Sequence, residues 1–454
     1  MAADLTRRLA AHAVRTRAED LPRPVLAMAT RCLLDAMGVA LAAGSLGSAV
    51  PAFLQLARAS GHGPCKVIGQ ELSVAPATAA LVNGALSHAL DFEDTHDEGL
   101  VHPTGTALPA ALAIAQLRGD VGGREFLAAL AVGSDITCRL GACMGNVDVP
   151  RGWAIRPLLG TYGATAAAGR LLGLDEDAMV EAFGLAFAQA TCSAGVFSYA
   201  PSHVREVRDG FAAQAAVTAA LLARGGLRAH DRAIEDVFTL YAGGQFDPDR
   251  LLRGLGEVFE STHLSFKPWP SCRGTHAFVE AAIALKAQHG FDAAAVGQVE
   301  AEVSDTFRVL CEPASQKARP QTAGDAKFSV PFTTAAALVH GSLGLNAFAP
   351  QALADARVLE LAQRVRCRVR APAGGADALQ GRLHVRLQDG RSWSLEVLQP
   401  LGDPARPLSE DALLRKFIDC ASHAPQPWSA DRARTFAASV AELELAGNLS
   451  VLAV

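Results

Sequence analysis

The pattern of apolar and polar positions divides the chain into two kinds of sequence. Up to about residue 260, stretches rich in Ala and Leu, with Gly near their ends, predict one helix after another. Small residues are so frequent in them that we expect closely packed helices, buried on more than one face. The clearest predicted helices are residues 30–43, 105–118, 124–140, 161–172 and 211–224.

Beyond residue 266 the apolar positions alternate with polar ones, which predicts strands. The alternation covers residues 299–303, 364–370 (RVRCRVR), 383–387 and 393–397. Asp389-Gly390 separates the last two runs, and a D-G dipeptide in that position is a strong signal for a β-hairpin. Helical patterns at 277–288 and 332–340 interrupt the strands, and the sequence from 409 onward is helical again.

These patterns predict a mainly α protein with two domains. We expect a large all-helical domain made from both chain ends, residues 1–265 and 400–454. Residues 266–399 would form a smaller α+β lid domain inserted between them. A cleft between two such domains is a common place for a small ligand, so we expect the substrate to bind there.

Composition narrows the classes of function. Half of the residues are apolar and the net charge is −5, which gives no basic face for a nucleic-acid partner. The chain shows no secretory signal and no uncharged apolar run of the ~20 residues that a membrane span needs, so we expect a cytoplasmic protein without a membrane partner. The nine cysteines include no C-x-x-C pair, which argues against a zinc site and a thioredoxin-type motif.

A polar segment between two apolar helices holds the most informative chemistry. Three histidines and five acids lie within 15 positions: His88, His96, His102, Asp91, Glu93, Asp94, Asp97 and Glu98. A solvated acidic loop is one interpretation of this composition. A metal site is another, although no His-x-x-x-His or His-Glu-x-x-His spacing supports it.

This segment resembles the signature of the MmgE/PrpD family. The string DFEDTH…HPTG follows NG-x-x-x-HA, and LLDAMGVALA, GTYGATAAAGRLLGL, FKPWPSCRGTH and AKFSVPFTTAAAL occur in the family's order. The family includes 2-methylcitrate dehydratases, cis-aconitate decarboxylase and iminodisuccinate epimerase. The resemblance implies a helical domain formed by both termini, a lid domain, a homodimer, and neither cofactor nor metal.

The resemblance also implies site residues. Asp91, Thr95 and His102 match the acidic, hydroxyl and histidine positions of the family's active-site loop. Lys267 matches the lysine at the junction between the domains, and His276 closes the same motif. Lys267 precedes an extended Pro-Trp-Pro run that suits an ammonium held in a cleft. An ordinary surface lysine is the alternative for that position.

Several positions depart from the decarboxylase branch. Ala154 replaces a histidine, Cys272 replaces a second histidine, Phe332 replaces a tyrosine, and no lysine occurs between residues 171 and 266. These departures argue against cis-aconitate decarboxylation. Arginines at 156, 205 and 208 offer positive charge in place of the lost groups, although each could equally be an ordinary surface residue.

The resulting hypothesis is a cofactor-independent lyase that dehydrates a small hydroxy-polycarboxylate resembling 2-methylcitrate. His102 would be the base or the acid, Asp91 would orient an imidazole, and Lys267, with Arg156, would neutralise carboxylate charge. Thr95, Cys272 and His276 would bind substrate, with Cys272 also able to be a core cysteine. An epimerase acting on a dicarboxylate such as iminodisuccinate, and a non-catalytic ligand-binding homologue, remain alternatives.

Overall fold

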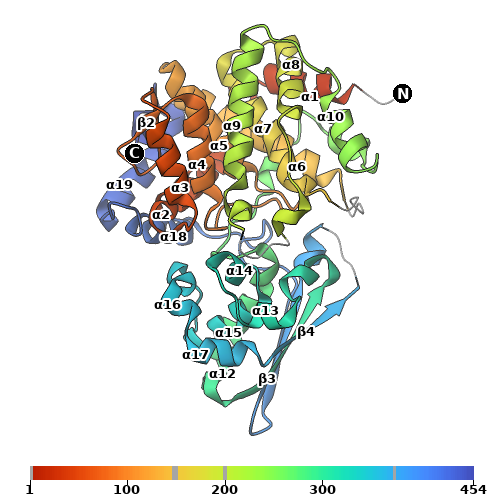
Figure 1. Cartoon of the computed structure of the whole chain (residues 1–454), viewed down its shortest axis with the longest axis vertical. Coiled ribbons are helices and arrows are strands. Elements are labelled where there is room, and N and C mark those ends of the chain that lie inside the picture. Colours follow the sequence, from red (N-terminus) through yellow and green to blue (C-terminus); the bar gives the residue numbers. More distant parts are fainter. Residues whose placement is uncertain (1–3, 146–151, 198–201, 372–374) are drawn as a thin grey trace. The chain divides into compact units, whose positions relative to one another are not determined.

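The computed structural model describes residues 4–145, 152–197, 202–371 and 375–454. The chain folds into two compact units (Figure 1). Unit 1 consists of Met1–Leu264 and Ser409–Val454, and unit 2 of Ser265–Leu408. Helices dominate the described residues, with small sheets only, so the prediction of a mainly α protein with a smaller α+β part is confirmed.

Unit 1 is almost entirely helical. Its only described strands, β1 (Cys65–Lys66) and β2 (Ser73–Val74), form a short antiparallel pair. The helices α7 (Ile155–Leu172) and α9 (Val204–Arg224) begin earlier than the sequence pattern predicted, and in α9 the first turns are rich in charged residues. The main helices are α1 (Leu5–Arg15), α2 (Arg23–Leu46), α3 (Val50–Ala59), α4 (Pro76–His88), α5 (Pro103–Arg118), α6 (Gly123–Ala142), α7 (Ile155–Leu172), α8 (Glu176–Phe187), α9 (Val204–Arg224), α10 (Ala233–Asp236), α11 (Pro248–Leu252), α18 (Glu410–Ser422) and α19 (Ala430–Ala441).

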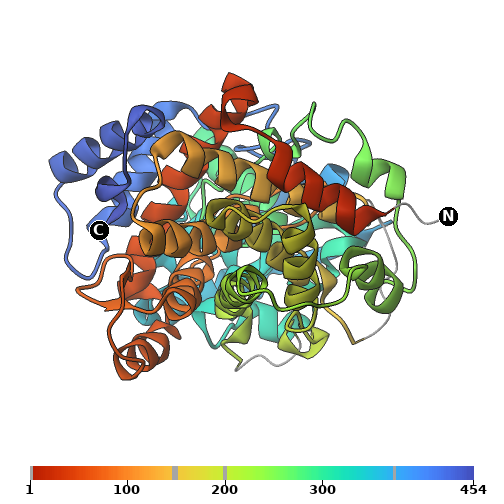
Figure 2. The same ribbon diagram turned by 90° about the horizontal axis from the view of Figure 1, so that it is seen from above.

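The helix α9 lies among α4, α5, α7 and α8, and Figure 2 views it nearly along its axis. Glycines allow α4 and α9 to approach closely. A Cβ added to Gly84 would lie 2.7 Å from the Cα of Gly210, and a Cβ added to Gly210 would overlap the backbone carbonyl of Leu81. Both contacts are with backbone atoms that cannot turn aside, so only glycine fits. This crossing brings the end of α4 to the beginning of α9.

The C-terminal helices return to unit 1, where α18 packs against α2 (Figure 1). Lys416 on α18 pairs with the buried Asp35 on α2 at 2.6 Å and donates a hydrogen bond to the Phe92 carbonyl at 2.7 Å. By length and composition alone, α2 would suit a membrane span. However, 72% of its most apolar stretch is buried inside the protein and Asp35 is ion-paired, as in a core helix.

Unit 2 contains a four-stranded sheet in the order β4-β3-β5-β6. β3 pairs with β4 in parallel and with β5 antiparallel, and β5 and β6 form the hairpin predicted around Asp389-Gly390. α12 and α15 cover the apolar face of the sheet and complete the core. The elements are β3 (Val296–Ser304), β4 (Val365–Arg370), β5 (Gly381–Leu387), β6 (Ser392–Val397), α12 (His276–His289), α13 (Ala314–Ala318), α14 (Ala323–Lys327), α15 (Val330–His340), α16 (Pro350–Leu353) and α17 (Ala356–Ala362).

Candidate active site

The polar segment between α4 and α5 is folded tightly into unit 1. Asp91 turns the chain with a left-handed φ of 49°, which Asp tolerates better than most residues, and its N–H donates to the His88 carbonyl. His96 and Val101 then form an isolated antiparallel bridge. Glu93 and His96 are at most 1% exposed. The interpretation as a solvated loop is therefore wrong for this part of the segment.

Glu93 lies between two imidazoles. Its Oε1 is 2.5 Å from His88 Nδ1 and 3.1 Å from His102 Nδ1. The backbone carbonyl of Asp94 is also 3.2 Å from His102 Nδ1. Since both oxygens are acceptors, neutral His102 carries its proton on Nδ1, and Nε2 is its basic nitrogen.

His88 has the same tautomer as His102, and a contact at its Nε2 atom fixes that tautomer. Arg208 Nη1 is 2.5 Å from His88 Nε2, and a guanidinium can only donate, so Nε2 accepts and Nδ1 bears the proton given to Glu93. The two rings are in edge contact, with centroids 5.0 Å apart. Arg208, His88, Glu93 and His102 thus form one continuous chain of hydrogen-bonding groups.

His102 and Arg208, the two ends of this chain of groups, line a cavity of about 360 Å³ in unit 1. His102 is the N-cap residue of α5 and Ala154 that of α7, so two helix N-termini meet at the cavity wall. Helix N-termini and a guanidinium both favour an anion. The lining residues are Leu100, Val101, His102, Thr106, Thr137, Trp153, Ala154, Ile155, Pro157, Gly160, Ala194, Arg208 and Asp209.

Buried acidic residues also affect the charge of the polar segment. Burial raises the pKa of Asp94 to about 7, and the charges of Asp35 and Glu93 act in the same direction. The nearby hydroxyl of Thr104 and the charge of Lys416 oppose this rise in pKa only in part. Asp94 is consequently partly protonated near neutral pH, which limits the negative charge that it shares with Asp35 and Glu93.

A second network holds the far end of the segment. Arg250 bridges Glu98 and Glu260 with distances of 2.8 and 2.6 Å, and His96 Nε2 lies 3.7 Å from Glu260. Burial raises the pKa of Glu260, but hydrogen bonds from His263, His96 and Arg250 outweigh it and hold that pKa well below its usual range. A permanently ionised Glu260 therefore fixes the segment to the chain around α11.

Among the residues that the structure describes, two groups of side chains have donor atoms close enough for a metal ion. The atoms offered by His88, Asp91, Glu93 and His102 all lie within 4.8 Å of one another, and such nitrogen and oxygen donors suit first-row divalent cations. In the observed arrangement both Nδ1 atoms donate protons to Glu93, so an ion would have to displace these bonds. The other group, His96, Glu98 and Glu260, already has Arg250 between its carboxylates.

Of the site residues predicted in unit 1, His102 lines the cavity. Asp91 and Thr95 are not among its lining residues. Thr95 is buried, and its hydroxyl donates to Asp97 at 2.7 Å. Asp91 belongs to the same cluster as the imidazoles, but the short contacts to both rings come from Glu93. The side chain of Arg156 lies outside the part of the chain that the structure describes.

The site residues predicted in unit 2 lie on one short stretch. Lys267 is fully buried, so its interpretation as a surface lysine is wrong. His276 Nε2 donates to the Ser271 carbonyl at 3.1 Å, and Arg273 Nη1 lies 3.3 Å from His276 Nδ1, so both ring nitrogens are engaged within unit 2. Cys272 is half-buried and packs against the apolar core of this unit, as expected for a core cysteine.

Sequence reasoning did not assign roles to Glu93 and His88, and it left Arg208 as one of three possible cations. A signal for the first two exists, because His88 and Glu93 both belong to the family motif, five residues apart. No sequence pattern marks Arg208, whose position depends on the crossing of α4 and α9.

Comparisons with known proteins agree with this architecture. Residues 7–245 match the MmgE/PrpD N-terminal domain and residues 269–442 the MmgE/PrpD C-terminal domain. A cis-aconitate decarboxylase-like protein, oryM of Aspergillus oryzae, is 30% identical over 95% of this chain and 93% of its own length. The cis-aconitate decarboxylases of Aspergillus terreus and Homo sapiens are 27% and 26% identical, over 88% and 87% of this chain and 85% and 82% of their own lengths. The chain belongs to the MmgE/PrpD family.

Proposed function

We propose that the protein is a lyase that acts on a small polycarboxylate by acid–base chemistry of its own side chains. One observation carries the proposal: His102 is held at Nδ1 by Glu93 and by the Asp94 carbonyl, which leaves Nε2 as a base at a cavity lined by Arg208. A histidine prepared in this way suits the removal of a proton from carbon near neutral pH.

The surroundings of His102 support an anionic substrate. A proton next to a carboxylate is a weak acid, and its removal places negative charge on the carboxylate oxygens, which must be stabilised in advance. The guanidinium of Arg208 and the N-termini of α5 and α7 supply positive potential at the cavity. Lys267 enters the proposal from the family resemblance alone, as a residue that neutralises carboxylate charge.

The reaction that we propose first is dehydration of a hydroxy-polycarboxylate resembling 2-methylcitrate. Nε2 of His102 takes the proton from carbon, and the electron pair of that carbon–hydrogen bond forms the alkene as the carbon–oxygen bond breaks. The imidazolium then gives the same proton to the departing hydroxyl group, which leaves as water. The imidazolium formed in this step is stabilised by the carboxylate of Glu93, 3.1 Å from Nδ1. Glu93 thus acts on the transition state through His102.

Decarboxylation of cis-aconitate is the second candidate, because the relatives named above carry that activity in their names. Ala154 lines the cavity where the decarboxylase branch has a histidine, and the lysine of that branch is missing between residues 171 and 266. A decarboxylase would need both groups to be replaced. The proton transfers of the dehydratase proposal need only His102, which lines the cavity, and Glu93 beside it.

Proton NMR in deuterated water distinguishes these reactions. The panel consists of 2-methylcitrate, citrate, cis-aconitate, iminodisuccinate and tartrate. Loss of a hydroxyl with gain of an alkene indicates dehydration, and release of carbon dioxide from cis-aconitate indicates the second candidate. Exchange of one carbon-bound proton without net change indicates an epimerase. Failure of all five acids to react or exchange would contradict the proposed substrate class.

Two variants test the role of His102 in whichever reaction is found. His102→Ala should abolish turnover while the thermal unfolding curve stays that of a folded protein. His230→Ala is the control, because His230 is a partly exposed histidine of unit 1 that pairs with Asp236. Full activity in His102→Ala would refute the assignment of the base.

A further inference from the structure

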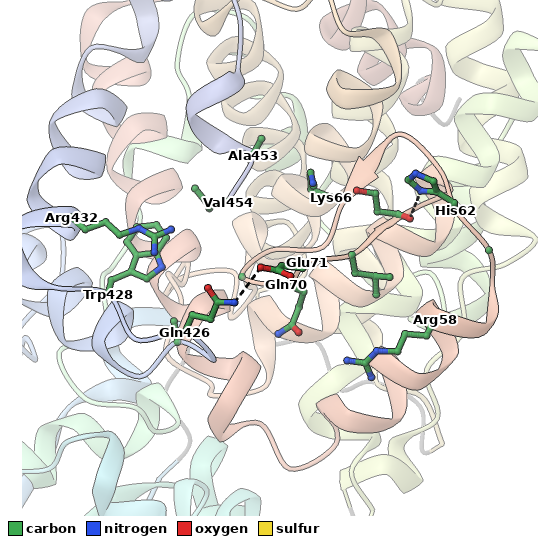
Figure 3. Close-up of a pocket in the computed structure, with 15 residues that line it drawn as sticks. Arg58, His62, Lys66, Gln70, Glu71, Gln426, Trp428, Arg432, Ala453 and Val454 are labelled. Atoms are coloured by element: carbon green, nitrogen blue, oxygen red, sulfur yellow. Dashed lines mark hydrogen bonds between the residues drawn. The ribbon is translucent and has the colours of Figure 1, made fainter.

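Unit 1 contains a second and larger cavity, of about 670 Å³, which shares no residue with the candidate active site. It lies between the end of α3, the β1–β2 pair and the α18–α19 turn, with residues 453–454 at one side (Figure 3). Its chemistry comes from six side chains: Arg58, His62, Lys66, Glu71, Trp428 and Arg432. None of these residues takes part in the proposed reaction.

The charges around this cavity are unbalanced. Arg58, Lys66 and Arg432 line it, and none of them has an ion-pair partner among the described residues. One acidic side chain, Glu71, faces them, and its Oε1 accepts a hydrogen bond from Gln426 at 3.4 Å. The α-carboxylate of Val454 lines the same cavity. Three cations against these two carboxylates leave a local excess of positive charge on a protein whose net charge is −5. Such a local field attracts anions.

One of these cations is held in place by packing. The guanidinium of Arg432 lies 4.1 Å from the ring centroid of Trp428, which is 7% exposed and packs edge-on against Phe417 and Phe436. Figure 3 shows Arg432 and Arg58 reaching into the cavity from α19 and α3. A cation positioned by an aromatic ring loses less freedom when it binds a ligand.

We propose that this cavity binds a small anion with two or more negative charges, at a site separate from the active site. Two guanidinium groups and an ammonium match carboxylate and phosphate oxygens equally well. The ligand is therefore a polycarboxylate or a phosphate compound. The proposal does not depend on which reaction the protein catalyses.

Isothermal titration calorimetry at low ionic strength tests the site, with tricarballylate and pyrophosphate as the two probes. The probe that binds more tightly assigns the class of ligand. Raising the salt concentration from about 20 to 200 mM should weaken binding, because exposed charges are screened over about 10 Å at 0.1 M. Absence of binding by both probes at millimolar concentration would overturn the proposal.

Substitutions of the lining residues test whether the anion binds in this cavity. Arg58→Gln and Arg432→Gln should each weaken it by about threefold to fivefold, and Glu71→Gln should strengthen it by a similar factor, because it removes the opposing charge. Arg434→Gln is the control on the same helix, since Arg434 pairs with Asp431. An equal loss in Arg434→Gln, or loss of binding in Arg208→Gln, would show that the anion binds elsewhere.

Discussion

The position of Glu93 between the imidazoles of His88 and His102 leads to the sharpest prediction, which concerns Glu93→Gln. Glutamine has nearly the same shape and keeps one acceptor oxygen, so the fold of the segment should survive. It loses the negative charge 3.1 Å from His102 Nδ1 and 2.5 Å from His88 Nδ1. We expect kcat/KM to fall because His102 becomes positively charged when it takes the substrate proton.

The size of the effect follows from the kind of bond that is lost. A hydrogen bond to a charged group contributes about 1.5–3 kcal/mol, against about 1 kcal/mol for a neutral one. Loss of roughly 1–2 kcal/mol at the transition state lowers kcat/KM by about fivefold to thirtyfold. A larger loss would mean that the amide has also reversed the tautomer of His102, since a carboxamide nitrogen can only donate.

Two measurements separate these effects. The pH profile of kcat/KM should have its acid limb moved to lower pH, because removal of a neighbouring carboxylate disfavours the imidazolium. Nitrogen-15 NMR of the histidine rings reports the tautomer of His102 without any substrate. Glu98→Gln is the matched control, since Glu98 lies in the same segment but is 49% exposed and paired with Arg250. Unchanged kcat/KM and tautomer in Glu93→Gln would refute the bridging role.

Three further predictions concern residues near Glu93 and the two helices that hold this region. Asp94→Asn should flatten the dependence of stability on pH. The folded-state pKa of about 7 lies above the ordinary value of 3.8, so ionisation destabilises the parent as pH rises from about 4 to 7, by at most about 4 kcal/mol. The difference in Tm between variant and parent should therefore grow over that range, and a constant difference contradicts this. Arg208→Lys keeps the charge but loses the planar donor at His88 Nε2, and should lower kcat/KM about tenfold without unfolding the protein. Gly210→Ala forces α4 and α9 apart and should cost about 1–3 kcal/mol, measured as a lower urea midpoint, whereas Gly447→Ala, with open space around it, should not.

The sequence predicted the architecture well, because periodic patterns report which face of an element is buried. The Asp389-Gly390 hairpin is present, with Val385 opposite Trp393 and Leu383 opposite Leu395. The start of α9 was missed because charged residues interrupt the apolar pattern in its first turns, and the start of α7 was missed as well. Local patterns thus identify an element more reliably than its ends.

The candidate site was predictable only in part. The family motif predicted a site role for His102, which lines the cavity, but five acids in the same segment carry no sign of which one faces an imidazole. That choice depends on the left-handed turn at Asp91, which directs Glu93 between His88 and His102. The position of Arg208 depends on a contact between glycines of two helices, which a single sequence does not reveal.

The contact between Lys416 and the polar segment has a consequence for how the protein is made. Lys416 donates to the Phe92 carbonyl across 324 residues of chain and also pairs with buried Asp35. At roughly 5–20 residues per second, a ribosome needs tens of seconds to travel from one to the other. Throughout that time Asp35 of the nascent chain lacks its ion-pair partner Lys416. Only a polypeptide extended through α18 can pair Asp35 with Lys416, so we expect the polar segment to reach its observed charge balance only at a late stage of translation.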